Sequence, residues 1–244
     1  MSSQKQVEIF GDSVLKGIQI NPENRRYHIN NTIDVAKIEQ THALSIRNFA
    51  KFGCTATKGL ALIEKRLKGQ EPFCDAVIMD FGGNDCDYNW AAIAESPQGE
   101  HLPHTPLETF AETYYKIIGL LKANGIRPIL TTLPPLDAQK FFHWFCNGLD
   151  KSKVLKWLGD VQLIYRWQES YSRTVEKIAR DTDTLLVDLR GAFLKHRNLD
   201  LLLCEDGTHP NTQGQRVITQ AFMDFIVSPQ ATQIIANAGV LQVR

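Results

Sequence analysis

Short apolar runs along the chain alternate with segments of helical periodicity, a pattern typical of parallel strands joined by crossover helices. Several runs are nearly unbroken, as expected for strands that helices cover on both faces. The predicted strands are Val7–Phe10, Ser45–Phe49, Ala76–Phe81, Pro128–Thr132 and Thr184–Asp188. The pattern therefore predicts an α/β fold with a mainly parallel, five-stranded sheet.

Apolar residues between these runs recur at the spacing of helices that bury one face. One stripe extends from Leu107 to Leu121, a second covers residues 161–179 and a third covers residues 217–226. Ser228 and Pro229 resemble an N-cap followed by proline at the first helical position, so we also expect a short terminal helix that closes near Gly239.

Two connections, Cys86–Pro106 and Pro134–Gly159, are longer than this topology requires. Long loops in a compact domain commonly carry function, so we expect both to face the substrate. The second contains the aromatic segment 141–145, which is followed by Trp157 and Trp167. Such side chains suit a core or a subunit interface of a homo-oligomer, and equally an acyl or sugar subsite, and the pattern leaves these alternatives open.

Length and composition narrow the class of protein. The chain has 244 residues and 43% hydrophobic content, which suits a single domain over residues 1–244. Its 27 basic and 27 acidic residues cancel, which disfavours nucleic acid or an anionic membrane as partner. We see neither a secretory signal nor a membrane span. The five scattered cysteines fit reduced thiols, so we expect a cytoplasmic protein without disulfides.

Polar residues with catalytic potential follow the predicted strands. Ligands of an open parallel sheet bind beyond the carboxyl ends of its strands. Gly11-Asp12-Ser13 follows the first strand, Gly53 lies after the second, Gly82-Gly83-Asn84-Asp85 follows the third, and Asp206-Gly-Thr-His209-Pro-Asn lies beyond the fifth. We therefore expect these segments to converge on one site.

The residue types in these segments supply the parts of a nucleophilic serine site. A neutral serine hydroxyl needs a base, a group that orients the base, and donors for the developing oxyanion. Ser13 lies in a strand-to-helix turn, where its own N–H and the helix N-terminus could stabilise an oxyanion. Asp206 and His209 are three residues apart, so the carboxylate can fold back onto one imidazole nitrogen. We predict that Ser13 is the nucleophile and His209 its general base.

The acidic residues and histidines allow other interpretations. Asp188, at the end of the fifth strand, is the rival of Asp206 as partner of His209, and the short tether favours Asp206. Asp12 and Asp85 are expected to bind neighbouring backbone N–H groups. His101 and His104, with the acidic residues 85–87, form no convincing set of metal ligands, so we expect no metal.

The chain resembles the GDSL, or SGNH, hydrolases in four motifs between residues 9 and 217. The matching residues are Ser13 in Gly-Asp-Ser, Gly53 in Phe-Gly-Cys-Thr, Asn84 in Gly-Gly-Asn-Asp, and His209 in Asp-Gly-Thr-His-Pro-Asn. The resemblance implies a flavodoxin-like, three-layer α/β/α sandwich. It also implies that Asp206 is the catalytic acid, that the Ser13 N–H, the Gly53 N–H and the Asn84 amide form an oxyanion hole, and that no cofactor is used.

The expected function is that of a serine esterase acting on a small-molecule ester. By analogy with family members of similar size, short acyl groups such as O-acetyl on a carbohydrate are the first expectation. A lysophospholipase or acyl thioesterase would use the same residues with a long apolar groove. A non-catalytic ligand-binding protein on this fold is an alternative of a different class, because a fold alone does not establish activity.

Overall fold

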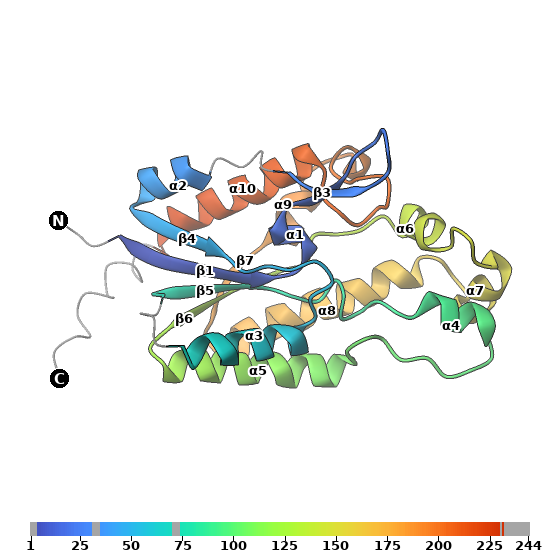
Figure 1. The fold of residues 1–244 in the computed structure, drawn as a ribbon, viewed down its shortest axis with the longest axis horizontal. Helices are drawn as coiled ribbons and strands as arrows, with labels where there is room; N and C mark the ends of the chain where they lie inside the picture. Colours follow the sequence, from blue (N-terminus) through green and yellow to red (C-terminus); the bar gives the residue numbers. More distant parts are fainter. Residues whose placement is uncertain (1–3, 31–34, 70–73, 230, 232–244) are drawn as a thin grey trace.

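A computed structural model describes residues 4–30, 35–69, 74–229 and 231 of the chain. All five predicted strands occur, and their ends differ from the prediction by at most two residues. They form one parallel sheet in the order β4-β1-β5-β6-β7 (Figure 1). Its strands are β1 (Lys5–Gly11), β4 (Leu44–Asn48), β5 (Ala76–Asp80), β6 (Arg127–Thr131) and β7 (Leu185–Val187).

Helices cover both faces of this sheet (Figure 1). One face packs against α3 (Ala56–Leu67), α5 (Leu107–Ala123) and α8 (Leu163–Asp181), and its core includes the fully buried Met79 and Tyr114. The opposite face packs against α9 (Leu189–Leu194) and α10 (Thr212–Ile226), with α2 (Val35–His42) beside β4. The predicted flavodoxin-like α/β/α sandwich is confirmed.

The strand order brings the loops after β1 and β5 together. The chain places β4 on one side of β1 and the remaining strands on the other, so the order reverses at β1, where parallel sheets commonly bind ligands. Gly11 pairs with Asp80 across β1 and β5. A Cβ atom at Gly11 would lie 2.9 Å from the Asp80 carbonyl oxygen, so this close approach of the two strand ends requires glycine.

The two long connections are not the open loops that the sequence suggested. The first contains α4 (Trp90–Glu95), and the second consists largely of α6 (Ala138–Phe145) and α7 (Lys151–Leu158). Asp137 and Asp150 cap α6 and α7 by accepting hydrogen bonds from backbone N–H groups of their first turns. Both helices have only about two turns, too short for a distinct apolar period.

These three short helices project beyond the carboxyl ends of the strands (Figure 1). A separate hydrophobic core lies there, and its aromatic side chains include Tyr88, Trp90, Phe142, Trp157 and Trp167. Packing therefore explains much of the aromatic concentration seen in the sequence. Phe141 on α6 packs against this core and also lines the pocket described below, whereas Trp144 contacts Tyr27 of the hairpin.

A β-hairpin that the sequence did not predict follows the first strand. Its strands, β2 (Ile18–Ile20) and β3 (Tyr27–Ile29), pair antiparallel and have only three residues each. Between β1 and this hairpin lies α1 (Ser13–Lys16), a single helical turn. The 3₁₀ turn η1 (Leu199–Leu201) precedes the segment that leads to α10. Most of the predicted terminal helix lies outside the described residues.

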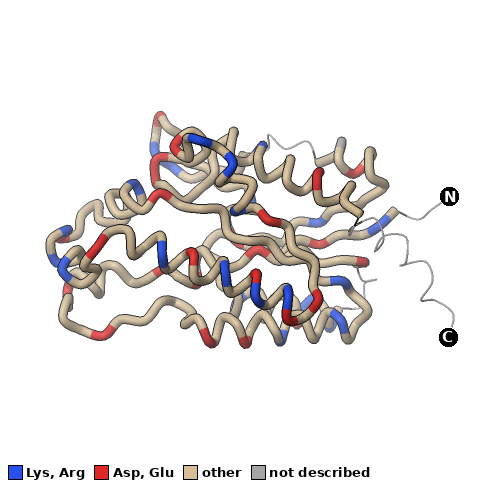
Figure 2. The backbone as a smooth tube through the Cα atoms, turned by 180° about the vertical axis from the view of Figure 1, so that it is seen from behind, with Lys and Arg blue, Asp and Glu red and all other residues tan. Residues whose placement is uncertain are grey.

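The structure locates the charged residues and the cysteines. On the face shown in Figure 2, basic and acidic residues are interspersed along the described backbone. All five cysteines are free; four are buried and Cys86 is partly exposed. None of the helices in the described part of the chain combines the length and apolar character that crossing a bilayer requires.

Candidate active site

Ser13 is the first residue of α1 and lies directly after β1. Asp12 caps this turn, because its Oδ1 accepts a hydrogen bond of 2.9 Å from the Val14 N–H. Ser13 is 7% exposed, so its hydroxyl sits at the base of a pocket rather than on the open surface. Because α1 is only four residues long, its dipole contributes less to oxyanion binding than the sequence suggested, and the Ser13 N–H itself is the main local donor.

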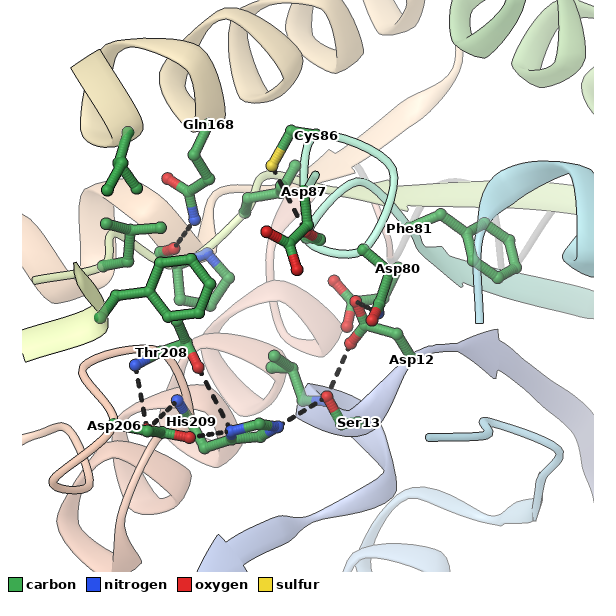
Figure 3. A pocket seen from close by; sticks show the side chains of 18 of the residues that line it. Asp12, Ser13, Asp80, Phe81, Cys86, Asp87, Gln168, Asp206, Thr208 and His209 are labelled. Atoms are coloured by element: carbon green, nitrogen blue, oxygen red, sulfur yellow. Dashed lines mark hydrogen bonds and ion pairs between the residues drawn. The ribbon is translucent and has the colours of Figure 1, made fainter. Parts of the chain in front are cut away.

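The loop before α10 brings His209 and Asp206 to Ser13 (Figure 3). His209 Nε2 lies 2.9 Å from Ser13 Oγ, and His209 Nδ1 lies 2.5 Å from Asp206 Oδ2. The second Asp206 oxygen accepts hydrogen bonds from the backbone N–H groups of Thr208 and His209, each at 3.1 Å. Gly207 turns the loop with a φ of 74°, a conformation that favours glycine.

Asp206 is held in its charged form. Burial raises the pKa of its carboxyl group, but the hydrogen bonds and charge of His209, together with the backbone donors, outweigh that effect and bring the pKa below its ordinary value. An ionised Asp206 fixes the proton on Nδ1 of His209, which leaves Nε2 free to accept the Ser13 proton.

Asp188, the rival acid, has different partners. It caps α9, and its Oδ1 accepts hydrogen bonds from the Gly191 N–H at 2.8 Å and from the Thr132 hydroxyl at 2.9 Å. The carboxylate that contacts His209 is that of Asp206.

Asn84 follows β5 and links the loops around Ser13. Its Nδ2 donates to Asp12 Oδ2 at 3.0 Å and, more weakly, to the Cys54 carbonyl oxygen at 3.4 Å. The backbone carbonyl oxygen of Asn84 accepts a hydrogen bond of 3.0 Å from Nδ1 of His104. The spacing of His104 along the sequence does not indicate this contact with Asn84.

Gly53 is the one predicted oxyanion residue that does not line the pocket. Its φ of 67° favours glycine, and no heavy atom lies within 4 Å of where a Cβ would stand. Its neighbours do reach the site, since Phe52 lines the pocket and the Cys54 carbonyl contacts Asn84. The role of the Gly53 N–H thus stays a prediction.

Two further carboxyl groups, those of Asp12 and Asp80, lie near Ser13 (Figure 3). Asp80 Oδ1 accepts a hydrogen bond of 2.7 Å from the Thr131 hydroxyl, and Asp80 Oδ2 is also buried. Burial raises the pKa of Asp80 to about 6, and burial and then the charge of Asp80 raise the pKa of Asp12 well above its ordinary value. The two groups therefore retain protons at pH values where exposed aspartates are ionised.

Asp85 has the structural contact expected from its place in a turn. Both of its carboxylate oxygens accept the Ala56 N–H, at 2.9 and 3.1 Å, at the start of α3. His101 bonds to the Ser96 carbonyl oxygen rather than joining His104. Within the described ranges, no three His, Cys, Asp or Glu side chains group together in a way that could hold a metal ion.

The pocket above Ser13 has a volume of about 250 Å³. Its walls come from the loop after β5, from α4, α6 and α8, and from the hairpin. Asp87 directs its carboxylate into the cavity (Figure 3) while accepting a 2.7 Å hydrogen bond from Trp90 Nε1. The side chains lining the pocket include the carboxyl groups of Asp12, Asp80, Asp87 and Asp206, and none of the described lining residues is a lysine or arginine.

Three solved structures resemble this chain over nearly its whole length. They are a catalytic mutant of an acetylxylan esterase from Geobacillus stearothermophilus (20% identity, 93% of this chain and 96% of that chain, TM-score 0.64), a lipase/acylhydrolase from Enterococcus faecalis (18%, 91% and 95%, 0.59) and an α/β hydrolase from the metagenome of Lake Arreo, Spain (20%, 100% and 99%, 0.60). At these identities the likeness shows the fold. No curated protein matches the chain significantly.

A family model identifies the chain more directly. The model of the GDSL-like Lipase/Acylhydrolase family matches residues 9–217, a range that contains Ser13, Gly53, Asn84, Asp206 and His209. This match covers far more than half of the chain, and it agrees with the fold of the similar structures. The chain belongs to the GDSL-like Lipase/Acylhydrolase family of ester hydrolases.

Proposed function

We propose that the protein is a serine esterase that hydrolyses carboxylic esters through an acyl-enzyme formed on Ser13. The observation that carries this proposal is the continuous chain of hydrogen bonds from Asp206 through His209 to the Ser13 hydroxyl. Each link lies within the distance at which a proton can be transferred between nucleophile and base. Ser13 comes from the amino-terminal part of the chain and Asp206 and His209 from the carboxyl-terminal part, and the three meet at the carboxyl end of β1.

The proposed reaction has two matched halves. Ser13 Oγ attacks the ester carbonyl carbon while its proton moves to His209 Nε2; the tetrahedral intermediate then expels the alcohol, which takes that proton from His209. The product is an ester between the acyl group and Ser13. Water then gives a proton to His209 and attacks this ester, and His209 returns the proton to Ser13 as the carboxylic acid leaves.

The negative charge of each tetrahedral intermediate requires donors. We propose the Ser13 N–H, the Gly53 N–H and the Asn84 side-chain amide for this role. The bond from Asn84 to Asp12 fixes the orientation of the amide, while its weak 3.4 Å bond to the Cys54 carbonyl is easily exchanged for a bond to an oxyanion.

Asn84→Ala should lower kcat by about two to three orders of magnitude, because one preorganised donor to the oxyanion is lost. Steady-state hydrolysis of p-nitrophenyl acetate measures this effect. Asn124→Ala is the matched control, since the Asn124 side chain donates to the Leu120 carbonyl oxygen at the end of α5 and does not line the pocket. A fall in kcat of tenfold or less in Asn84→Ala would remove Asn84 from the oxyanion hole.

We propose short acyl groups, with O-acetyl groups on a carbohydrate as the natural substrate class. The pocket volume is below the usual range for drug-sized ligands, which favours a short acyl chain. Its described lining includes the ionised Asp206 and contains no lysine or arginine, which disfavours phosphate-bearing lysophospholipids and coenzyme A thioesters. One of the structurally similar proteins is an acetylxylan esterase, which agrees with this choice.

A larger apolar cavity, of about 740 Å³, does not extend the site. It lies between α2, α10 and the amino-terminal halves of the strands, and its lining includes Leu44, Ala76, Ile129 and Phe222. Ser13 and His209 line the other pocket only, so this cavity offers no groove for an acyl chain attached to Ser13.

The substrate proposal predicts a falling series of p-nitrophenyl esters. Because the leaving group is constant, changes in kcat/KM from acetate to octanoate report on the acyl side alone. We expect the acetate to be hydrolysed best and the octanoate about tenfold or more slower, as longer chains exceed the pocket. A maximum at eight carbons or beyond would instead favour the lysophospholipase or thioesterase alternative.

Two broader proposals concern the whole protein. We propose that residues 1–244 act as one catalytic domain, since the described strands and helices build a single sandwich.

We also propose that the protein acts in the cytoplasm, because five free cysteines fit a reducing compartment.

A further inference from the structure

Two exposed aromatic rings flank His209. Tyr27, from β3, has its ring centroid 5.2 Å from the His209 ring, and Phe52, from the loop after β4, lies 6.0 Å from it with nearly parallel planes. The two aromatic rings are 5.1 Å apart. Tyr27 is 42% exposed and Phe52 is 56% exposed, so both present apolar surface to solvent at the mouth of the pocket.

The hairpin that carries Tyr27 is fastened on two sides. The Tyr27 hydroxyl accepts a 3.1 Å hydrogen bond from Trp144 Nε1 on α6. Arg25 places its guanidinium 4.8 Å from the Trp144 ring centroid and bonds at 3.1 Å to Glu205, the residue before Asp206. The hairpin with Tyr27 is thereby tied both to α6 and to the loop that carries Asp206, so a ligand meets a Tyr27 ring that is largely held in place.

The proposed reaction indicates which part of the ester contacts this aromatic surface. In the proposed mechanism, Nε2 of His209 hands its proton to the oxygen of the departing alcohol, so that oxygen must lie against His209. Side chains packed around His209 therefore contact the alcohol part of the ester. The carbonyl oxygen points instead toward the proposed oxyanion donors, which include Asn84.

The chemistry of this surface points to a sugar. Flat rings with exposed faces pack against the C–H faces of a pyranose, while the adjoining pocket offers carboxylate oxygens that accept hydrogen bonds from hydroxyl groups. Burial and then the negative charge of Asp206 raise the pKa of Tyr27 to about 12, so its hydroxyl stays neutral.

We propose that Tyr27, Phe52 and Trp144 form a stacking platform that binds the pyranose ring of the alcohol released by the esterase. This inference rests on the proposed function and adds to it the residues that select the alcohol. Phe52 is the decisive position, because it is the most exposed of the three and makes no hydrogen bond through its side chain.

The test compares two acetyl esters that differ only in the alcohol. An acetylated xylobiose carries pyranose rings, whereas ethyl acetate carries an alcohol too small to reach the platform. p-Nitrophenyl acetate is unsuitable, because its flat leaving group would itself stack on the rings. We expect Phe52→Ala to lower kcat/KM for acetylated xylobiose about three- to tenfold more than for ethyl acetate, mostly through KM.

Three further variants separate stacking from other effects. Phe52→Tyr keeps a flat ring and should keep the wild-type ratio of the two substrates, whereas Phe52→Leu keeps apolar bulk without the ring and should behave like Phe52→Ala. Tyr115→Ala is the control, because Tyr115 is a partly exposed tyrosine on α5 that does not line the pocket.

Each outcome has a distinct meaning. Equal losses for both esters in Phe52→Ala would mean that the change disturbs the neighbouring Gly53 and would overturn the platform. If Phe52→Leu kept the wild-type ratio of kcat/KM for the two esters, an apolar side chain without a ring would be sufficient, and stacking would likewise be rejected. A wild-type enzyme that hydrolyses ethyl acetate but no acetylated xylobiose would contradict the carbohydrate substrate itself and the platform with it, while leaving the esterase mechanism in place.

Discussion

Ser13→Ala protein should fold normally and hydrolyse esters about a millionfold more slowly than the wild type. The change removes one oxygen atom and with it the only atom that can form the acyl-enzyme in the proposed mechanism. The fold should tolerate it, because alanine fits the first turn of α1 and the cap on that turn comes from Asp12. The measurements are kcat for p-nitrophenyl acetate and the midpoint of thermal unfolding.

Covalent labelling gives an independent readout of the same residue. A fluorophosphonate should modify Ser13 in the wild type, and mass spectrometry should find the label on the peptide that contains Gly11-Asp12-Ser13. Ser152→Ala is the matched control, since Ser152 is an exposed serine on α7 that bonds to Asp150. An active Ser13→Ala enzyme would exclude Ser13 as nucleophile, and a wild type with neither turnover nor label would favour the non-catalytic binding protein.

The sheet was predictable because its strands are covered on both faces. Such strands must be apolar at successive positions, so segments such as Ile129–Thr131 stand out from the helices without any knowledge of their partners. The convergence of Ser13, Asn84 and His209 follows in the same way, since a parallel sheet collects the residues after its strands at one edge.

The walls of the site were less predictable, because short elements carry little periodicity. The hairpin strands have three residues each, and Tyr27 and Phe52 lie on exposed segments whose apolar residues have no repeating pattern. Their contact with His209 depends on tertiary packing. The same holds for Asp80. The sequence presents it only as the last residue of a buried strand, whereas the fold places it beside Asp12 and near Ser13.

The choice between the two candidate acids depends on tertiary contacts that the sequence alone does not reveal. The sequence offered Asp206 and Asp188, and it could rank them only by the length of the chain that joins each to His209. The structure gives them different neighbours: Asp206 bonds to His209 Nδ1, and Asp188 caps α9.

Asp206→Asn should lower kcat by about four orders of magnitude at neutral pH. An asparagine amide has nearly the same size but no charge, so it neither stabilises the imidazolium nor fixes the Nδ1 proton that leaves Nε2 free for Ser13. The structural cost should be small, because the remaining amide oxygen can still accept the backbone N–H groups of Thr208 and His209. Kinetics with p-nitrophenyl acetate measure the loss.

Asp188→Asn is the matched control, and it carries the same chemical change at the rival position. Asparagine caps helices about as well as aspartate, so α9 should keep its cap and kcat should stay within about threefold of the wild-type value. The contrast between the two variants isolates contact with His209, since size and loss of charge are common to both. A larger loss in Asp188→Asn than in Asp206→Asn would transfer the role to Asp188, which would require the loop before α10 to rearrange during turnover.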